Sequence, residues 1–316
     1  MGRKYLMKMV SLRILLALSL LLGFGTANLV WAEAEAPGAT LPANLKIEQW
    51  KGHEFTFLAL PADRQAAGYE IFTVAQATQG FKGDRLVRIP YPEHVGKQVT
   101  VTEIVSFAIP YDQQEYMVYM TVNETGEKLV GRTTRGQLEG MVLTADLRNA
   151  RQQFLGKTVY PKFRELVELN VLGWNTVPAS VSTRIGDSVK VIDVYAGNQS
   201  QEKIWLIVTA NGKKAILPID YSWTNTPIQI WTQNPPWQNA LFMEDPKITL
   251  GGSYDLWNNI QSGDIQEGMT KAHVQLSWGK PLKIEANGSV WIYNTKKLTF
   301  WGDVLYSIET ISDDTP

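Results

Sequence analysis

The residues able to support catalysis are few in this chain and widely spaced. The three histidines, His53, His94 and His273, lie far apart, and none forms a ligand pair of the H-E-x-x-H kind. The sequence contains no cysteine and no Gly-x-Ser-x-Gly turn around a nucleophilic serine. We therefore expect no metal site, no cofactor and no enzymatic activity.

Paired carboxylates are the remaining catalytic signal, because glycoside hydrolysis needs two acids flanking the scissile bond. Asp112 and Glu115 lie in a Tyr- and Gln-rich turn, and Glu244 and Asp245 lie in a Pro-rich segment. Such positions favour solvated loop charge, and Gly-rich phosphate-binding loops are absent from the sequence as well. A hydrolase with a site at a junction between modules is kept as a second alternative.

The first 32 residues predict export. Four basic residues precede an apolar run from Ile14 to Phe24, and small residues at cleavage spacing end at Ala32. We expect a signal peptide over residues 1–32; cleavage after Ala27 and an uncleaved membrane anchor are the alternatives. The cleaved chain would have no stable membrane anchor and would be periplasmic or secreted. The formal net charge of −1, more negative without these basic residues, disfavours a nucleic-acid partner.

Most of the remaining chain has the pattern of antiparallel β-strands. Residues 33–47 are rich in Ala, Pro and Glu and predict a flexible lead. From Trp50 onward, short runs of alternating apolar residues are bounded by Gly, Pro or Asn. Asn211-Gly212 between two such runs predicts a tight hairpin that pairs residues 204–210 with residues 213–218.

An internal repeat divides this β region into two modules. Two pairs of segments align: QWKGHEF at 49–55 with QFLGKTV at 153–159, and VGKQVTVTEIV at 95–105 with IGDSVKVIDVY at 185–195. We therefore expect tandem β modules over residues 48–147 and 148–230, joined by an amphipathic helical piece at 143–154. The strand rhythm of each module resembles the small Src-homology-like barrels of bacterial envelope proteins.

Residues 231–248 interrupt the strand rhythm with three prolines and several large aromatic rings, and we interpret them as a linker. A solvated linker rarely contains so many rings. We therefore expect Trp231, Trp237 and Phe242 to pack across the seam between the second module and the region that follows. The alternative is that Trp237 presents its ring to a partner.

Residues 249–316 predict helices followed by strands. Thr270 is placed to cap a helix, with Met269 and Val274 at the two positions of a hydrophobic staple. An earlier helix begins after Ser253, which is also a capping residue. Three alternating runs then follow, KIEANGSVWIYN, KLTFWG and VLYSIE. We expect two helices that cover one face of a three-stranded antiparallel sheet.

This last region carries a family resemblance. The segments GMTK at 268–271, GKP at 279–281 and W-x-Y at 291–293 are similar to the BamE/SmpA/OmlA family of outer-membrane assembly proteins, whose fold family includes the β-lactamase-inhibitor-protein repeats. The resemblance covers residues 253–311 and implies a non-enzymatic α+β domain that presents surfaces to envelope proteins or lipid. The chain departs from the family in lacking a lipidated cysteine, in its preceding β modules, and in His273, which replaces the expected capping glutamate.

These features predict a mainly β protein with a C-terminal α+β domain that acts by binding. We expect an envelope protein as the partner and an assembly or scaffold role; peptidoglycan or another polysaccharide bound by the β modules is the first alternative. The candidate contact residues are Lys271, Trp278, Trp301 and Trp237. For Trp278 and Trp301 the structural alternative is that both rings fill the gap between helices and sheet.

Overall fold

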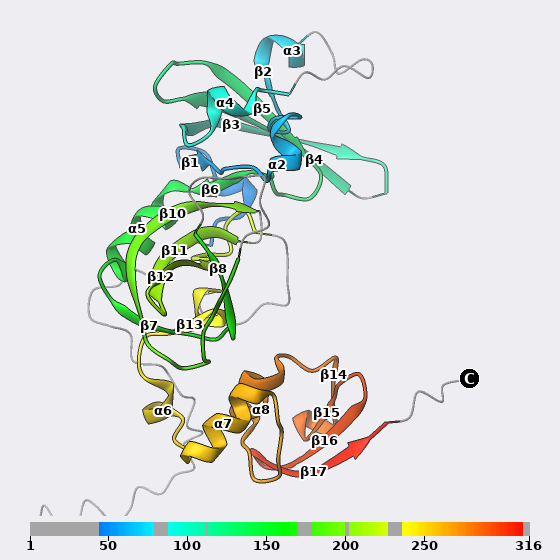
Figure 1. The fold of residues 1–316 in the computed structure, drawn as a ribbon. Coiled ribbons are helices and arrows are strands. Elements are labelled where there is room, and N and C mark those ends of the chain that lie inside the picture. The colour runs from blue at the N-terminus through cyan, green and yellow to red at the C-terminus, as the bar shows by residue number, and fades with distance from the viewer. Residues whose placement is uncertain are drawn as a thin grey trace, which may run out of the picture. The chain divides into compact units, whose positions relative to one another are not determined.

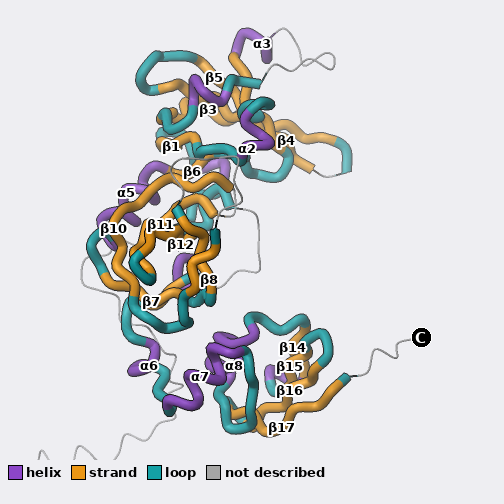
Figure 2. The backbone as a smooth tube through the Cα atoms, viewed as in Figure 1, coloured by secondary structure: helices purple, strands orange, loops and turns teal. Residues whose placement is uncertain are grey.

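The computed structural model of the chain describes residues 44–78, 88–111, 113–169, 179–199, 202–226 and 236–311. These residues are mainly β, with antiparallel sheets and few helices, as the strand pattern predicts (Figure 1 and Figure 2). The predicted signal peptide at 1–32, most of the predicted lead and Trp231 lie outside the described ranges. No helix within those ranges is long and apolar enough to cross a bilayer.

The first sheet has six strands in the order β2-β5-β4-β3-β1-β6, with antiparallel neighbours throughout. The strands are β1 (Glu54–Phe57), β2 (Ile71–Thr73), β3 (Gln98–Ile109), β4 (Gln113–Val122), β5 (Lys128–Thr133) and β6 (Met141–Leu143). Short helical turns lie between them: η1 (Ile47–Gln49), α2 (Ala62–Gln65), α3 (Val74–Thr78) and α4 (Tyr91–His94). Trp50, Phe55 and Phe57 are fully buried at the centre of its core.

The second sheet has seven strands in the order β13-β7-β10-β11-β12-β8-β9, and its neighbours are antiparallel too. The strands are β7 (Thr158–Pro161), β8 (Glu165–Glu168), β9 (Ser180–Ser182), β10 (Val189–Gln199), β11 (Glu202–Ala210), β12 (Lys213–Ile219) and β13 (Leu241–Phe242). Helix α5 (Thr144–Phe154), predicted from the amphipathic pattern at 143–154, precedes them, and η2 (Pro236–Asn239) leads into β13. Phe154 and Val159 belong to the apolar core of this sheet.

The two sheets share one strand order. Counted from β6 and from β13, the orders β6-β1-β3-β4-β5-β2 and β13-β7-β10-β11-β12-β8 correspond strand by strand. The N–H of Gly52 donates to the Val101 carbonyl at 2.8 Å, and the N–H of Gly156 donates to the Val191 carbonyl at 2.9 Å. A break in strand register follows Val101 in β3 and Val191 in β10. The glycines that align in the sequence therefore occupy equivalent turns.

The hairpin between β11 and β12 is the one predicted from Asn211-Gly212. These residues have positive φ angles of 48° and 75°. Ala210 pairs with Lys213 directly across the turn. Asn and Gly adopt this conformation more readily than other residues, which is why two letters of sequence were enough to place the turn.

Part of the predicted linker belongs to the second sheet. Leu241 and Phe242 pair with β7, and the Trp237 ring lies edge-on against Phe154 with their centroids 5.3 Å apart. Trp237 is only 7% exposed, so its ring does not face solvent. The prediction of a linker is therefore wrong for residues 236–242, because burial of the Trp237 ring in the core of the second sheet removes more apolar surface from water than an exposed linker would.

The end of the predicted flexible lead is also held in place. The N–H of Trp223 donates to Oδ1 of Asn44 at 2.8 Å, and the N–H of Leu45 donates to Oγ1 of Thr224 at 2.9 Å. Ile47 is buried in the core of the first sheet. Residues 44–47 are thus ordered by contacts with a segment that lies far away in sequence.

The C-terminal region has two helices, α7 (Tyr254–Ser262) and α8 (Lys271–Trp278), beside a sheet in the order β14-β15-β16-β17 (Figure 1). The strands are β14 (Lys283–Glu285), β15 (Val290–Ile292), β16 (Lys296–Trp301) and β17 (Val304–Thr310). The core residues are Met269, Val274, Trp291, Leu298, Phe300 and Leu305. Both helices start where predicted, at the caps Ser253 and Thr270.

One more strand is present than the predicted three. The run at 283–294 folds back on itself through η3 (Ala286–Gly288), in which Asn287 has a φ of 55°. The run therefore supplies both β14 and β15, which pair antiparallel. Trp291 and Phe300 lie in one sheet with their ring centroids 4.9 Å apart.

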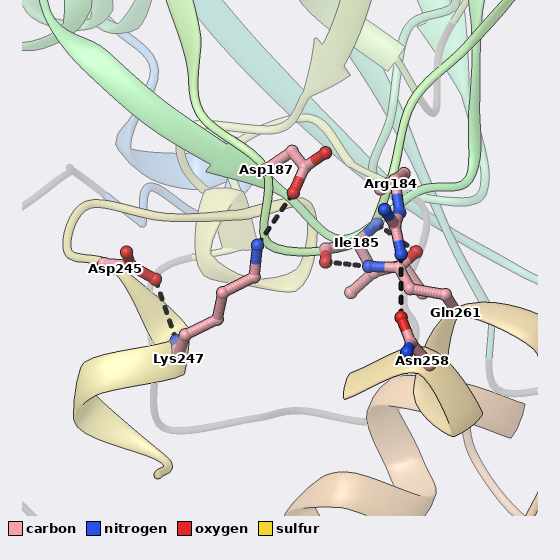
Figure 3. A network of polar contacts seen from close by, with 7 residues as sticks. All are labelled: Arg184, Ile185, Asp187, Asp245, Lys247, Asn258 and Gln261. Carbon is pink, nitrogen blue, oxygen red and sulfur yellow. Dashed lines mark hydrogen bonds and ion pairs between the residues drawn. The ribbon is translucent and has the colours of Figure 1, made fainter. Parts of the chain in front are cut away.

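Polar contacts connect α6 (Pro246–Thr249) and α7 to the second-sheet loop around residue 185 (Figure 3). The backbone N–H of Ile185 donates to Oε1 of Gln261 at 2.8 Å, and the Gln261 amide donates back to the Ile185 carbonyl. Lys247 pairs with Asp187 at 2.8 Å. Ile185 also packs in a small apolar cluster with Trp257.

The guanidinium of Arg164 binds the ends of both C-terminal helices. It donates to the carbonyls of Ile260 and Gln261, each at 2.7 Å, and to the carbonyl of Ser277 at 2.8 Å. Carbonyls in the last turn of a helix lack intrahelical partners and form its negative end, so they attract a cation. One side chain thereby pairs with carbonyls in the last turns of both α7 and α8.

Asn225 joins the two large sheets. It has a φ of 56°, and its amide group donates to the carbonyls of Leu138 and Met141 at 2.8 and 2.9 Å. Its Oδ1 accepts a hydrogen bond from the N–H of Leu138 at 2.8 Å. All three bonds are buried, so loss of this amide would leave backbone groups without partners.

We predict that Asn225→Ala lowers the free energy of unfolding by about 2–4 kcal/mol, since three buried hydrogen bonds at about 0.5–1.5 kcal/mol each are lost. Asn211→Ala is the matched control: Asn211 also has positive φ, but it is exposed and makes one hydrogen bond, to the Ser182 carbonyl. It should cost about 1 kcal/mol or less beyond the backbone strain that both variants share. Urea denaturation measures both; equal losses would contradict the role assigned to Asn225.

Candidate functional site

An exposed aromatic pair stands out on the C-terminal sheet. Trp301 is 81% exposed and Tyr306 is 64% exposed, and their rings meet edge to face with centroids 6.4 Å apart. Val304, which pairs with Trp301 across the β16–β17 hairpin, is 45% exposed. We call Trp301, Val304 and Tyr306 the hairpin patch. Clustered apolar side chains on a surface mark contact sites more reliably than single ones do.

The hairpin patch rests on a rigid support. Phe300 and Leu305, its neighbours along the strands, are buried on the opposite face against the helices. The residues before α8 also pair with the hairpin: the N–H of Leu305 donates to the Met269 carbonyl at 2.7 Å, and the N–H of Gly268 donates to the Leu305 carbonyl at 2.9 Å. The N–H of Lys271 donates to the Asp303 carbonyl at 2.9 Å. The backbone that carries the patch residues is therefore held on two sides, by the pairing of β16 with β17 and by the hydrogen bonds to residues 268–271.

The sheet face beside the patch carries balanced charge. Along β16, Lys297 and Thr299 alternate with the buried Leu298 and Phe300 and so share a face with Trp301. Lys297 pairs with Glu309 of β17 across the strands at 3.1 Å. An aromatic patch next to a neutralised ion pair suits a partner that buries apolar surface more than a highly charged polymer.

The four sequence-predicted contact residues have different surroundings. Among them, Trp301 alone is mostly exposed to solvent. Trp278 is half-buried; its Nε1 donates to the Gly263 carbonyl at 2.6 Å, and its ring lies edge-on to Tyr293. This is the gap-filling position that was the structural alternative for Trp278.

The other two predicted contact residues offer little surface. Lys271 is half-buried, with Nζ 5.4 Å from the centroid of the Phe300 ring, so it supports the hairpin from the helix side. Trp237 is buried in the core of the second sheet. The structure therefore does not place Trp237 on a surface with the exposed candidate Trp301.

Tyr306 is a patch residue that sequence reasoning missed. Strict alternation along VLYSIE places Tyr306 on the same face as Ile308, which packs against the core. The register shifts between Thr299 and Phe300, so Leu305 pairs with Phe300 while Ser307 pairs with Thr299. Tyr306 falls at this irregularity and turns outward. The local sequence pattern of β17 does not predict this shift in register.

A cluster of buried ionisable groups is the most chemically unusual feature elsewhere. Oδ2 of Asp146 accepts a hydrogen bond from Ser222, while Lys203, only 3% exposed, donates from Nζ to the carbonyls of Thr224 and Asn225. Burial raises the pKa of Asp146 to about 7, against the opposing effects of the Ser222 hydrogen bond and the Lys203 charge. Burial likewise lowers the pKa of Lys203, which the nearby carboxylates of Asp220 and Asp146 oppose.

Perturbed pKa values often mark catalytic sites, but this cluster is enclosed. Ser222 is 2% exposed, Asp146 is 3% exposed, and the ammonium of Lys203 bonds to backbone of the segment 222–226. That segment is the one that carries Asn225. We therefore assign the cluster a structural role, in which it holds the segment that joins the two large sheets. Across the described ranges, no group of three or more metal-binding side chains is assembled.

The raised pKa of Asp146 predicts a specific pH dependence. Between about 3.8, its ordinary value, and about 7, the folded state keeps a proton that the unfolded state has released. The free energy of unfolding should therefore fall as the pH rises through this range, by up to roughly 4 kcal/mol at about 1.4 kcal/mol per pKa unit. Asp146→Asn cannot titrate and retains an acceptor for Ser222, so this fall should be absent. Urea denaturation between pH 4 and 7.5 tests it; parallel curves would refute the assignment.

The hairpin patch is thus a surface of the described residues that combines large exposed rings with a rigid support. Its chemistry is that of contact rather than of bond making, since it offers rings and a branched aliphatic side chain. Searches with this chain find no matching protein-family model, no matching curated protein and no matching solved structure.

Proposed function

We propose that this chain is an exported, non-catalytic cell-envelope protein that binds another envelope protein through the hairpin patch, in an assembly or scaffold role. The basic, apolar and small-residue order of residues 1–32 supports export to the periplasm or beyond. The single observation that carries the binding role is the exposed Trp301–Tyr306 pair on a hairpin fixed by α8.

The proposal extends to the architecture. The shared strand order of the first two sheets supports two tandem copies of one small barrel-like module. The capped helix pair beside an antiparallel sheet, with Trp291 and Phe300 in contact, supports the resemblance of residues 253–311 to the BamE/SmpA/OmlA family. That resemblance is what suggests an envelope protein as the partner.

The energetics favour a contact role for the two rings. An aromatic side chain buries roughly 150–250 Å², worth about 4–6 kcal/mol at 25 cal/mol per Å² when fully removed from water. Trp301 and Tyr306 still expose most of their surface, so most of that free energy remains available to a partner. Tryptophan and tyrosine are enriched among the residues that dominate interface affinity.

Peptidoglycan bound by the β modules is the alternative favoured by a separate observation. Phe107 on β3 and Tyr111 at the end of the same hairpin are exposed, as is Tyr195 on the corresponding strand β10. Aromatic rings on protruding strands can stack on sugar rings. This alternative places the contact on residues of the first two sheets and not on the hairpin patch, so the two can be separated by mutation.

Site-specific photocrosslinking in intact cells tests the proposal. A photoreactive phenylalanine analogue at position 301 should crosslink to one discrete envelope protein, whereas the same group at position 254 should not. Tyr254 is the matched control, because it is an aromatic residue with 77% exposure outside the patch. Equal crosslinking at both positions, or none at 301, would argue against the patch as the contact.

Trp301→Ala should then weaken binding of the crosslinked partner by about 30-fold or more, the loss typical of a hot-spot residue. Its free energy of unfolding should stay within about 0.5 kcal/mol of wild type, because the ring is exposed. Isothermal titration and urea denaturation measure the two quantities. Sedimentation with purified peptidoglycan that depends on Tyr111 but not on Trp301 would support the alternative instead.

A further inference from the structure

We propose that His273 is an acid-sensitive latch that fixes the hairpin patch only while its imidazole is neutral. The role of the hairpin patch in this inference rests on the proposed function. The latch itself is a property of the C-terminal region alone. It concerns the start of helix α8, where histidine occupies the position in which a capping glutamate was expected.

His273 and Thr270 form a reciprocal capping box. Oγ1 of Thr270 accepts a hydrogen bond from the N–H of His273, and Nδ1 of His273 accepts one from the N–H of Thr270, each at 3.3 Å. A glutamate would accept this second bond in its charged form. An imidazole can accept it only when Nδ1 has a free lone pair, which protonation removes. Protonation of Nδ1 therefore breaks the hydrogen bond that this nitrogen accepts from the N–H of Thr270.

The surroundings offer the imidazolium little compensation at its other nitrogen. His273 is 4% exposed, and its buried Nε2 makes no hydrogen bond of ordinary geometry within the described residues, although the Leu250 carbonyl lies near the ring. The ring of Trp257 from α7 lies edge-on to it, with centroids 6.4 Å apart. Burying a cation with so little compensation is costly, so protonation should open this packing.

Two neighbouring groups favour the proton but do not outweigh burial. Burial lowers the pKa of His273, while the nearby carbonyl of Leu250 and the carboxylate of Asp303 in the β16–β17 turn act to raise it. The positive end of helix α8 also disfavours a cation in its first turn. Between the lowered folded pKa and 6.5, the unfolded state holds a proton that the folded state lacks. Stability in this region is therefore lost as the pH falls below about 6.5.

The latch connects directly to the hairpin patch. Thr270 forms a β-bridge with Val304, and the flanking residues bond to the backbone of Asp303 and Leu305. When the cap at Thr270 opens, residues 268–271 are no longer held in place, so β17 loses its pairing with them. Trp301 and Tyr306 then sit on a hairpin held from one side only.

Amide hydrogen exchange on the full chain tests the latch without any partner. After correction for intrinsic rates, protection of residues 268–271 and 303–306 should fall at least about tenfold from pH 7 to pH 5 in the wild type. His273→Gln retains an oxygen acceptor for Thr270 and cannot titrate, so its protection should be unchanged.

His94→Gln is the matched control. His94 is also buried, but its Nδ1 faces the Pro90 carbonyl and its Nε2 faces Glu127, so both nitrogens meet acceptors and a proton breaks neither bond. This variant should lose hairpin protection in acid as the wild type does. Constant protection in the wild type, or an equal acid loss in His273→Gln, would overturn the latch. Absence of a crosslinked partner at neutral pH would overturn the proposed function and leave the latch standing.

Discussion

The reciprocal hydrogen bonds between Thr270 and His273 are the contact on which the candidate site depends. They start α8 at a defined residue, and the preceding residues then lie in register with β17. Val274 and Met269, on either side of the cap, are both fully buried beneath the sheet. The cap and the core of the C-terminal region therefore form one structural unit. The cap holds the residues that pair with β17, and this pairing fixes the hairpin that carries Trp301.

The two large sheets are joined in a different way. Their shared segment, residues 222–226, is held by buried polar groups, among them Lys203 and the side chain of Asn225. Such groups contribute little net stability when paired but cost much when one partner is missing. They specify one arrangement of the segment and leave few alternatives, which an apolar contact of equal area would not do.

Tryptophans of this chain show how tertiary surroundings decide the use of a residue. Trp237 fills the core of the second sheet, Trp278 donates a hydrogen bond to the end of α7 while filling a gap, and Trp301 lies exposed on a hairpin. Trp237 had been a candidate contact residue as a ring in the predicted linker, and Trp278 and Trp301 as rings on one face of the C-terminal region. The size of a ring predicts that its burial is energetically favourable. It does not predict whether the ring is buried in the chain's own core or against a partner.

The sequence by itself determined the features that depend on hydrogen bonds within a few residues, namely the caps at Ser253 and Thr270 and the Asn211-Gly212 hairpin. The alternation of apolar residues also determined the mainly β character. Only the tertiary structure decided that β13 joins the second sheet and that Tyr306 faces outward. It also decided that the His273 ring is buried against Trp257 of α7. Caps and turns are closed by neighbours along the chain, whereas sheet membership, register shifts and burial depend on partners far away in sequence, which no local pattern records.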